Sequence, residues 1–344
     1  MTNRSLKAGI IGCGRIAGDF EDDPTWLRKP CTHAGVLSSI EEVEISAVCD
    51  NDYDKARSFA DKWNVPAFYQ NVVDFLEHGY FDIVSICTPP STHCDITTLV
   101  AKKQPKLIFS EKPLATSYID GEKMVQCCKE AGCHLVVNHN KRWNSVVEKA
   151  KELIANGVIG CPLAIVCRYT SGLEIVGTHL VDLILNFVDE SLPINLFSLK
   201  EKTKIRKLWY SENYSQLDPA FSGMVLFDNG IIGVLIGSCL KDYPHFSIEI
   251  DGTHGQIQLL NNCMELYVGQ AKSNSMFGGA KRLHFEQFNI KVEESEMMQA
   301  MKENITLCKG KIKESSSSGE NALKVIDLIE RLRKKGISFE YGKV

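Results

Sequence analysis

The sequence predicts an α/β Rossmann domain followed by an α+β domain with a large, mainly antiparallel open sheet. Short apolar strands alternate with helices up to residue 140, as in a doubly wound parallel sheet. Strand-like segments dominate after Pro162, with a hairpin turn at Asp228-Asn229-Gly230. The length of 344 residues suits two domains. We place them at residues 1–140 and 141–344, and expect the C-terminal helix to pack back on the first domain.

The composition argues against several classes of function. A formal net charge of −4 gives no attraction to nucleic acid or to an anionic membrane. No apolar stretch approaches the ~20 residues of a membrane helix, and Met1–Ser5 does not begin a signal peptide. The 13 cysteines lack zinc or iron–sulfur spacing, so we expect no metal site and mostly buried, reduced thiols. These features predict a cytoplasmic protein.

The segment Leu6–Gly18 organises the first domain. An apolar strand runs into Gly12-Cys13-Gly14-Arg15-Ile16-Ala17, and a helix is expected to follow, which is the order of a dinucleotide fingerprint. Gly12 allows the tight turn, Gly14 lets a pyrophosphate approach the backbone, and Ala17 keeps the helix close to the strand. The helix N-terminus then offers N–H groups to the phosphates.

The rest of the first domain follows in alternation. Further strands are expected at residues 43–49, 67–69, 82–88, 107–110 and 134–138, and helices at 33–40, 53–64, 72–78, 93–103 and 118–131. The polar segment Asp19–Pro30 holds two prolines and is expected to form a loop.

Asp50 ends the second strand of the first domain. A carboxylate at this position accepts hydrogen bonds from the adenosine ribose and repels a 2′-phosphate. The loop Asp19–Pro30 explains why Asp50 lies beyond the usual offset of ~20 residues. A turn residue or helix cap is the alternative interpretation. No basic residue follows until Lys55, so NAD is favoured over NADP.

The second domain is predicted to be mostly strands. They are expected at residues 162–169, 194–199, 207–210, 221–227, 231–239, 246–250, 256–260 and 264–268, with a turn at 252–255. Helices are expected at 144–156, 178–188, 293–309 and 318–335, and a loop at 272–281. The run Ser315–Ser318 is expected to cap the last helix.

Polar residues follow several predicted strands. Glu111-Lys112-Pro113 comes directly after the fifth strand, at the edge where a doubly wound sheet binds its ligands. A lysine there can donate to a substrate hydroxyl or transfer a proton, although a surface lysine paired with Glu111 explains the pattern equally well. Asn138, Asn140 and Arg142 follow the sixth strand, and Arg168 and Tyr169 end the first strand of the second domain.

We expect these residues to reach the same cleft. Arginine suits bidentate contact with a phosphate or carboxylate. Each residue by itself is equally consistent with a surface or salt-bridge role.

Five motifs occur in the order found in the glucose–fructose oxidoreductase / inositol dehydrogenase / MocA (Gfo/Idh/MocA) family, which the chain resembles over nearly its whole length. They are Gly12–Ala17, Asp50, Thr88-Pro89-Pro90 with His93, Glu111-Lys112-Pro113, and Gly177-Thr178-His179-Leu180-Val181-Asp182. The resemblance implies NAD(P)-dependent oxidation or reduction of a sugar, polyol or sugar nucleotide. It also implies homodimers or homotetramers formed through the C-terminal sheet.

The resemblance assigns roles to individual residues. Lys112 and His179 are the expected catalytic residues beside the reacting hydroxyl, and His179 takes its proton. Asp182, one helical turn after His179, orients the imidazole, binds substrate or pairs locally. The peptide bond between Lys112 and Pro113 is expected to be cis. Cofactor contacts are expected at Gly12, Gly14, Arg15, Ile16, Asp50, Thr88, Pro89, His93, Glu111 and Lys112, and substrate contacts at Asn140, Arg142, Arg168, Tyr169 and Asp182.

One position departs from the family pattern. Many dehydrogenases of the family carry an aspartate four residues before the histidine, where this chain has Ile175 beside Glu174. Either His179 acts without that partner, or Glu174 replaces it, or the site does not catalyse. The leading hypothesis is an NAD-dependent oxidoreductase. The alternatives are an NAD(H)- and sugar-binding regulatory protein and a glycoside-processing enzyme with transient NAD redox.

Overall fold

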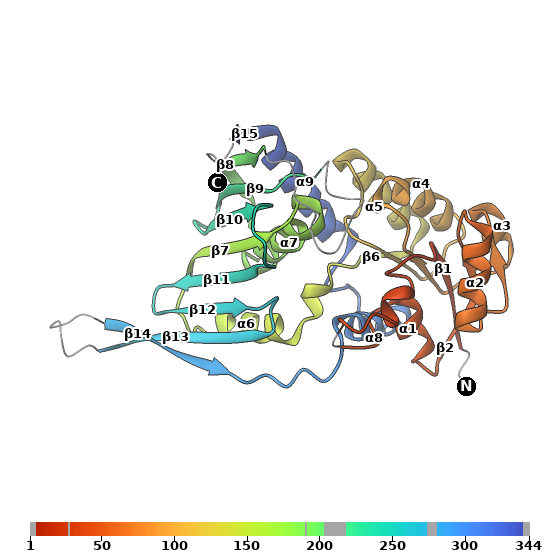
Figure 1. Cartoon of the computed structure of the whole chain (residues 1–344), viewed down its shortest axis with the longest axis horizontal. Coiled ribbons are helices and arrows are strands. Elements are labelled where there is room, and N and C mark those ends of the chain that lie inside the picture. The colour runs from red at the N-terminus through yellow and green to blue at the C-terminus, as the bar shows by residue number, and fades with distance from the viewer. Residues whose placement is uncertain (1–4, 27, 190, 203–217, 274–280, 340–344) are drawn as a thin grey trace. The chain divides into compact units, whose positions relative to one another are not determined.

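The computed structural model describes residues 5–26, 28–189, 191–202, 218–273 and 281–339. Figure 1 labels the helices and strands along the chain. The chain divides into two compact units. Unit 1 comprises residues 1–143 and 293–326, and unit 2 comprises residues 144–292 and 327–344.

Unit 1 is built on a six-stranded parallel sheet in the order β3-β2-β1-β4-β5-β6. Its strands are β1 (Leu6–Ile11), β2 (Val43–Cys49), β3 (Phe68–Tyr69), β4 (Ile83–Ile86), β5 (Leu107–Ser110) and β6 (His134–Val137). Its helices are α1 (His33–Ser38), α2 (Tyr53–Trp63), α3 (Val72–Glu77), α4 (Pro90–Ala101), α5 (Tyr118–Ala131), α8 (Glu296–Cys308) and the first part of α9 (Gly319–Lys335). The predicted Rossmann sheet is confirmed.

The sheet of unit 1 is buried on both faces, which explains its nearly continuous apolar strands. One core packs Ile10 and Phe109 with Met301 of α8. The other packs Ile86 and Ile108 with Ile326 of α9. Residues from the last part of the chain therefore complete the core of the N-terminal sheet. Ser318 accepts a hydrogen bond from the N–H of Asn321 (3.2 Å), so the predicted serine cap of α9 is confirmed.

The helix predicted directly after the glycine turn is corrected by the structure. Residues 14–18 form turns, closed by the N–H of Gly18 donating to the carbonyl of Gly14 (3.1 Å). The next regular helix, α1, begins only at His33. Its first N–H groups donate to the carbonyls of Ile16 (3.2 Å) and Ala17 (2.8 Å). Turns therefore replace the helix expected between the glycine turn and the loop Asp19–Pro30, and α1 pairs back onto the glycine turn.

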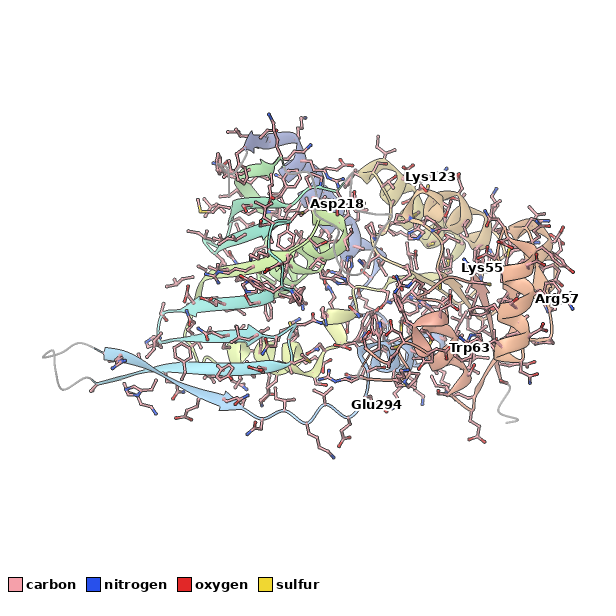
Figure 2. The ribbon with its side chains drawn as sticks, in the orientation of Figure 1. Lys55, Arg57, Trp63, Lys123, Asp218 and Glu294 are labelled. Atoms are coloured by element: carbon pink, nitrogen blue, oxygen red, sulfur yellow. The ribbon has the colours of Figure 1, made fainter. Side chains whose placement is uncertain are left out.

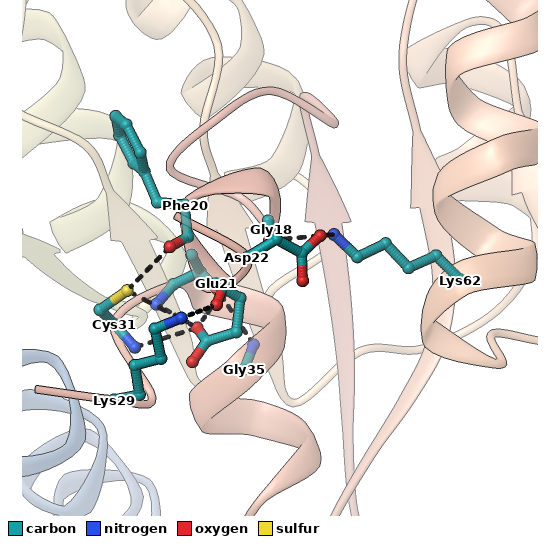
Figure 3. A network of polar contacts seen from close by, with 9 residues as sticks. Gly18, Phe20, Glu21, Asp22, Lys29, Cys31, Gly35 and Lys62 are labelled. Carbon is teal, nitrogen blue, oxygen red and sulfur yellow. Dashed lines mark hydrogen bonds and ion pairs between the residues drawn. The ribbon is translucent and has the colours of Figure 1, made fainter. Parts of the chain in front are cut away.

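Glu21 closes this intervening loop (Figure 3). Its carboxylate accepts from the N–H of Cys31 (3.0 Å) and from the N–H and hydroxyl of Thr32 (3.2 and 2.8 Å). Lys29 donates to the Glu21 carbonyl, and Lys62 of α2 pairs with Asp22 (2.6 Å). These bonds bring the two ends of the loop together, so α1 can start beside the glycine turn.

Unit 2 contains a nine-stranded sheet in the order β14-β13-β12-β11-β7-β10-β9-β8-β15. Its strands are β7 (Pro162–Thr170), β8 (Pro193–Glu201), β9 (Phe221–Phe227), β10 (Ile232–Ser238), β11 (Phe246–Gly252), β12 (Gly255–Leu260), β13 (Glu265–Ser273), β14 (Lys281–Phe288) and β15 (Gly336–Phe339). Only β7–β10 and β8–β15 are parallel among the described strands, so the predicted, mainly antiparallel sheet is confirmed.

The two faces of this sheet differ. Ile165, Cys167 and Tyr169 point to the buried face, which packs against α6 (Ser145–Ala155), α7 (Thr178–Phe187) and the last part of α9. The opposite face exposes Phe197, Met224 and Ile236, which are 50%, 51% and 40% exposed. The alternation of side chains along the strands creates this contrast.

Several local predictions for unit 2 need correction. The predicted loop 272–281 is wrong at its described ends, because β13 extends to Ser273 and β14 begins at Lys281, pairing Ser273 with Lys281. The sequence analysis did not identify β14 or β15. The predicted strand at 207–210 lies outside the described residues.

The described residues include no helix long and apolar enough to cross a membrane. All thirteen cysteines are described and none forms a disulfide; all except Cys127 and Cys161 are buried.

Candidate functional site

The order of the strands in unit 1 defines the binding edge of the sheet. The order reverses between the adjacent strands β1 and β4. Dinucleotides bind beyond the carboxyl ends of the strands at such a switch point. Gly12, Thr88, Glu111 and Asn138 follow the ends of β1, β4, β5 and β6. The predicted cofactor residues of unit 1 therefore gather along one edge.

Gly12 and Gly14 play different parts in this edge. Gly12 has φ +92°, and an added Cβ would lie 2.8 Å from the backbone of Cys87. Only glycine fits this tight turn. A Cβ on Gly14 would meet only the Lys55 ammonium, at 3.8 Å. The backbone at Gly14 is therefore open to a ligand, as the fingerprint predicts.

The side chains of Arg15 and Ile16 are engaged within the protein. The Arg15 guanidinium lies 4.4 Å from the centre of the Phe20 ring, a cation–π contact. Ile16 packs against the core beneath β1. Ile16 can therefore contact the cofactor only through its backbone. Arg15 can do so through its backbone, or through its side chain if the guanidinium leaves the Phe20 ring.

Asp50 joins the end of β2 to the glycine turn. Its buried carboxylate accepts from the N–H of Cys13 (2.8 Å) and of Asp52 (3.1 Å). Lys55, from the first turn of α2, lies 3.5 Å from the same carboxylate and is labelled in Figure 2. The structure thus brings a cation to the position where the sequence analysis counted none.

The loop after β4 depends on His93. Thr88 accepts from the hydroxyl of Thr92 (2.8 Å), and Pro89 is the N-cap residue directly before α4. The His93 ring is fully buried, with Nε2 2.8 Å from the Thr88 carbonyl and Nδ1 3.0 Å from the Pro113 carbonyl. The predicted cofactor contact of His93 is therefore corrected. Its ring fills the space between the loops after β4 and β5, and in either neutral tautomer its one N–H donates to a backbone oxygen of one of them.

Glu111 is the centre of a buried polar network after β5. One carboxylate oxygen lies 3.0 Å from Nε2 of His33 and accepts from the Asn138 amide (2.7 Å). The other accepts from the backbone N–H of Lys112 (3.3 Å). Burial alone raises the pKa of Glu111, but the hydrogen bonds and the charges of His33 and Lys112 outweigh it and leave the pKa below its ordinary value. The ionised carboxylate fixes the backbone that carries Lys112.

The segment that carries Lys112 has the predicted backbone geometry, because the peptide bond from Lys112 to Pro113 is cis. Asn138 Oδ1 is buried and has no hydrogen-bond partner among the described atoms. This oxygen is an acceptor that a ligand can satisfy.

Asn140 and Arg142 lie in the 3₁₀ helix after β6, Asn140–Trp143. Arg142 is buried and donates to the carbonyl of Ser316 (2.9 Å). It therefore links this helix to the serine loop that precedes α9. This is a structural role for Arg142, in place of the predicted contact with substrate. Asn140 Oδ1 is buried without a hydrogen-bond partner in the described part of the chain.

In unit 2, neighbouring residues of β7 have opposite environments. Tyr169 is fully buried, and its hydroxyl exchanges hydrogen bonds with the backbone N–H (3.0 Å) and carbonyl (3.1 Å) of Phe221. Burial raises the pKa of this hydroxyl. The predicted substrate contact of Tyr169 is corrected, because its ring fills the space beside Gly177 and Gly237. Arg168 points to the other face, where it pairs with Glu249 of β11.

His179 and Asp182 occupy the first turns of α7. His179 is half-buried and Asp182 is fully buried. The preceding turn, Leu173–Gly177, holds Ile175 in place of the family's aspartate. The Glu174 carboxylate pairs with Arg333 of α9, so it is already engaged within unit 2.

Asp218 supplies a carboxylate to this turn and is labelled in Figure 2. It is buried, and one oxygen accepts from the N–H groups of Glu174 (2.8 Å) and Ile175 (3.0 Å). Burial raises its pKa, although the two N–H groups and Arg333 act in the opposite direction. Asp218 therefore fixes the turn that leads into His179.

Sequence reasoning missed both His33 and Asp218. His33 lies 78 residues from Glu111, and Asp218 lies 43 residues from Ile175. No local spacing links either pair. The position of Glu111 directly after an apolar strand was the only signal in the sequence that a polar partner was needed.

Comparisons with known proteins agree with this arrangement. Residues 6–139 match the model of an oxidoreductase family with an NAD-binding Rossmann fold, Gfo/Idh/MocA. The chain is 26% identical over 264 residues to myo-inositol 2-dehydrogenase of Thermotoga maritima, covering 73% of this chain and 74% of the relative. It is 27% identical over 271 residues to D-apiose dehydrogenase of Rhizobium rhizogenes, covering 75% and 74%.

The fold is also found among solved structures. The WlbA dehydrogenase from Bordetella pertussis, solved in complex with NADH and UDP-GlcNAcA, superposes with a TM-score of 0.75. The match covers 96% of each chain at 19% sequence identity. At this identity the similarity shows a common fold.

Proposed function

We propose that this chain is an NAD-dependent oxidoreductase of a sugar, polyol or sugar nucleotide, of the Gfo/Idh/MocA family whose model matches its residues 6–139. The proposal rests on one observation above all. The open backbone at Gly14 adjoins the Asp50 carboxylate at the switch point of the sheet.

The residues of unit 1 fit the cofactor. Gly14 leaves space over the turn, Asp50 offers a carboxylate to the ribose, and Asn138 Oδ1 is a buried acceptor without a partner among the described atoms. These groups, with the backbone of Thr88, would hold NAD. When bound, the nicotinamide accepts a hydride from, or donates one to, a substrate carbon. Lys55 neutralises part of the charge of Asp50, so the preference for NAD over NADP depends on both residues.

The proposed catalytic roles follow from chemistry. Lys112 donates a hydrogen bond to the substrate oxygen and stabilises the charge that develops there. The imidazole of His179 accepts the hydroxyl proton during oxidation and returns it during reduction, a role for which histidine is the commonest side chain. His33 and Asn138 act through Glu111 to fix the backbone of Lys112, and Asp218 acts on the turn before His179.

The substrate class is proposed from relatives. Two are named as dehydrogenases of myo-inositol and D-apiose, and one structural neighbour was solved with NADH and UDP-GlcNAcA. Myo-inositol, D-apiose and UDP-GlcNAcA all carry secondary hydroxyl groups, so we propose a secondary alcohol, or the ketone derived from it, as the reacting group.

The test is replacement of Lys112. We expect Lys112→Met to lower turnover by about 100-fold or more, with NADH affinity within about threefold of wild type. Lys103→Met is the matched control, because Lys103 pairs with Glu77 on the surface and should leave turnover unchanged. Activity is measured as NADH absorbance with a panel of sugars and sugar nucleotides, and affinity by NADH fluorescence.

Three outcomes would contradict the proposal or its roles. Near-normal turnover of Lys112→Met removes the lysine from catalysis. Binding of the nicotinamide cofactor and a sugar with neither NAD+ reduction nor NADH oxidation favours the regulatory protein. A changed glycoside product without net NADH favours transient redox.

We further propose that the open face of the unit 2 sheet forms a homodimer or homotetramer. Phe197, Met224 and Ile236 lie on this face, and such a contiguous apolar surface is unusual on a monomer. Replacement of Met224 by lysine should shift the mass measured by light scattering toward the monomer. A wild-type chain that is already monomeric would refute this assembly.

A further inference from the structure

Unit 2 contains a pocket of about 520 Å³ at the carboxyl end of β7. Its walls include Thr170, Val176, His245, Ser247, Asn261 and Met264, and all its lining residues belong to unit 2. The volume is that of a small-molecule site. Val176 lies three residues before His179, so the wall of the pocket continues directly into the helix of the proposed base.

His245 and Ser247 on one wall of the pocket belong to a chain of hydrogen-bonding groups that continues outside the wall to Lys241. The Lys241 ammonium lies 3.0 Å from Nδ1 of His245, and Nε2 of His245 lies 3.0 Å from the Ser247 hydroxyl. An ammonium group only donates, so Nδ1 accepts and Nε2–H donates to Ser247 Oγ. The hydroxyl hydrogen of Ser247 is then free of His245 and can donate to a ligand in the pocket.

Positive charge exceeds negative charge around the hydrogen-bonded groups Lys241, His245 and Ser247. Arg168, which pairs across the sheet with Ser247, is balanced by Glu249. Within the described ranges, no carboxylate lies within 4.0 Å of the Lys241 ammonium. Burial and the charge of Arg168 lower the pKa of Lys241, and burial together with both cations lowers the pKa of His245. Asp242 is exposed to solvent. The Glu265 carboxylate accepts a hydrogen bond from the Asn261 amide.

We propose that this pocket binds an anionic group of the substrate, a phosphate or a carboxylate, through the Ser247 hydroxyl and the charges of Lys241 and Arg168. This inference rests on the proposed function as a sugar oxidoreductase and narrows its substrate to sugars that carry such a group. Among the described residues, no acceptor is recorded for the Ser247 hydroxyl hydrogen and no carboxylate pairs with Lys241, and an anion can supply both. The apolar side chains of Val176 and Met264 can cover the adjoining sugar or base.

Binding to the full chain tests the proposal without requiring turnover. The probes are UDP, which carries phosphates, glucuronate, which carries only a carboxylate, and myo-inositol, which is neutral. We expect UDP or glucuronate to bind and Lys241→Met to weaken that binding about 10- to 100-fold. Ser247→Ala should weaken it in the same direction. Binding of UDP alone identifies a phosphate site, and binding of glucuronate alone identifies a carboxylate site.

The matched control is Lys272→Met, because Lys272 pairs with Glu286 on β13 and β14 and should not affect the probes. Urea unfolding of each variant verifies that the fold is retained. The proposal is overturned if neither anion binds, or if Lys241→Met and Ser247→Ala bind both anions as tightly as wild type.

The outcome is separable from that of the proposed function. Turnover of an anionic sugar by Lys241→Met with wild-type kcat and KM would refute the anion site and leave the oxidoreductase intact. Anion binding that depends on Lys241, without NADH oxidation by any sugar, would support the site and count against the oxidoreductase.

Discussion

Replacing Gly12 and Gly14 by alanine separates the two roles of the glycine turn. Gly12 has φ +92°, and its added Cβ would lie 2.8 Å from the Cys87 backbone. A strained φ costs about 1–3 kcal/mol, and overpacking costs about 1–3 kcal/mol more. Gly12→Ala should therefore lose roughly 2–6 kcal/mol of folding free energy. Such a loss is a large fraction of the 5–15 kcal/mol typical of a domain.

Gly14→Ala should affect NADH binding and leave the stability of the fold intact. Its Cβ would meet only the Lys55 ammonium at 3.8 Å, and its φ is not in the left-handed region. Stability should stay level or rise by about 0.4–1 kcal/mol, since alanine restricts the unfolded chain. The same methyl group occupies the space over the turn, so NADH affinity should fall about 10- to 100-fold, equivalent to one lost charge-assisted hydrogen bond.

Two measurements distinguish the variants. Urea unfolding is followed by tryptophan fluorescence, which reports mainly on unit 1 because Trp26, Trp63 and Trp143 lie there. NADH binding is followed by nicotinamide fluorescence. The reasoning fails if Gly12→Ala unfolds at the wild-type urea concentration, or if Gly14→Ala binds NADH as tightly as wild type.

Two further predictions concern the carboxylates of unit 1. Asp50→Ala should weaken NADH binding about 10- to 100-fold while NADPH binding changes less, because Lys55 remains beside the ribose site; an unchanged NADH/NADPH affinity ratio would refute the role of Asp50. The lowered pKa of Glu111 means that its stabilising effect is present above its ordinary pKa of 4.5 and is lost as the pH falls through the lower, folded-state value. Glu111→Gln should therefore be about 1.5–3 kcal/mol less stable than wild type at pH 7, with the gap closing below pH 4.5 in urea unfolding; an equal gap at both pH values would count against an ionised Glu111.

Local pattern was sufficient to predict most of the secondary structure. The strands β2, β5 and β9 and the helix α5 have the predicted bounds, because their apolar periodicity and turn residues are local properties. The helix after the glycine turn was mispredicted, because nothing local shows that Glu21 closes a loop and lets α1 pair back onto Ile16 and Ala17.

The candidate site divides in the same way. The glycine turn and Asp50 were predicted from their positions at strand ends, whereas position left the role of Lys112 open and the family resemblance supplied it. Arg168 and Tyr169 could not be distinguished, because the sequence shows that neighbours on a strand face opposite ways but not which face the helices cover. The structure buries Tyr169 against Phe221 and leaves Arg168 on the open face.

The sequence by itself determined the Rossmann architecture, the glycine turn with its acidic partner at the end of β2, and the lysine after β5. These follow from the order and local chemistry of neighbouring residues. Only the tertiary structure decided that His33 supports Glu111, that Asp218 supports the turn before His179, and that Lys241 and His245 stand behind Ser247. Such partners meet because strand order and packing bring separate parts of the chain together, and each buried polar group must find a partner wherever the fold places one.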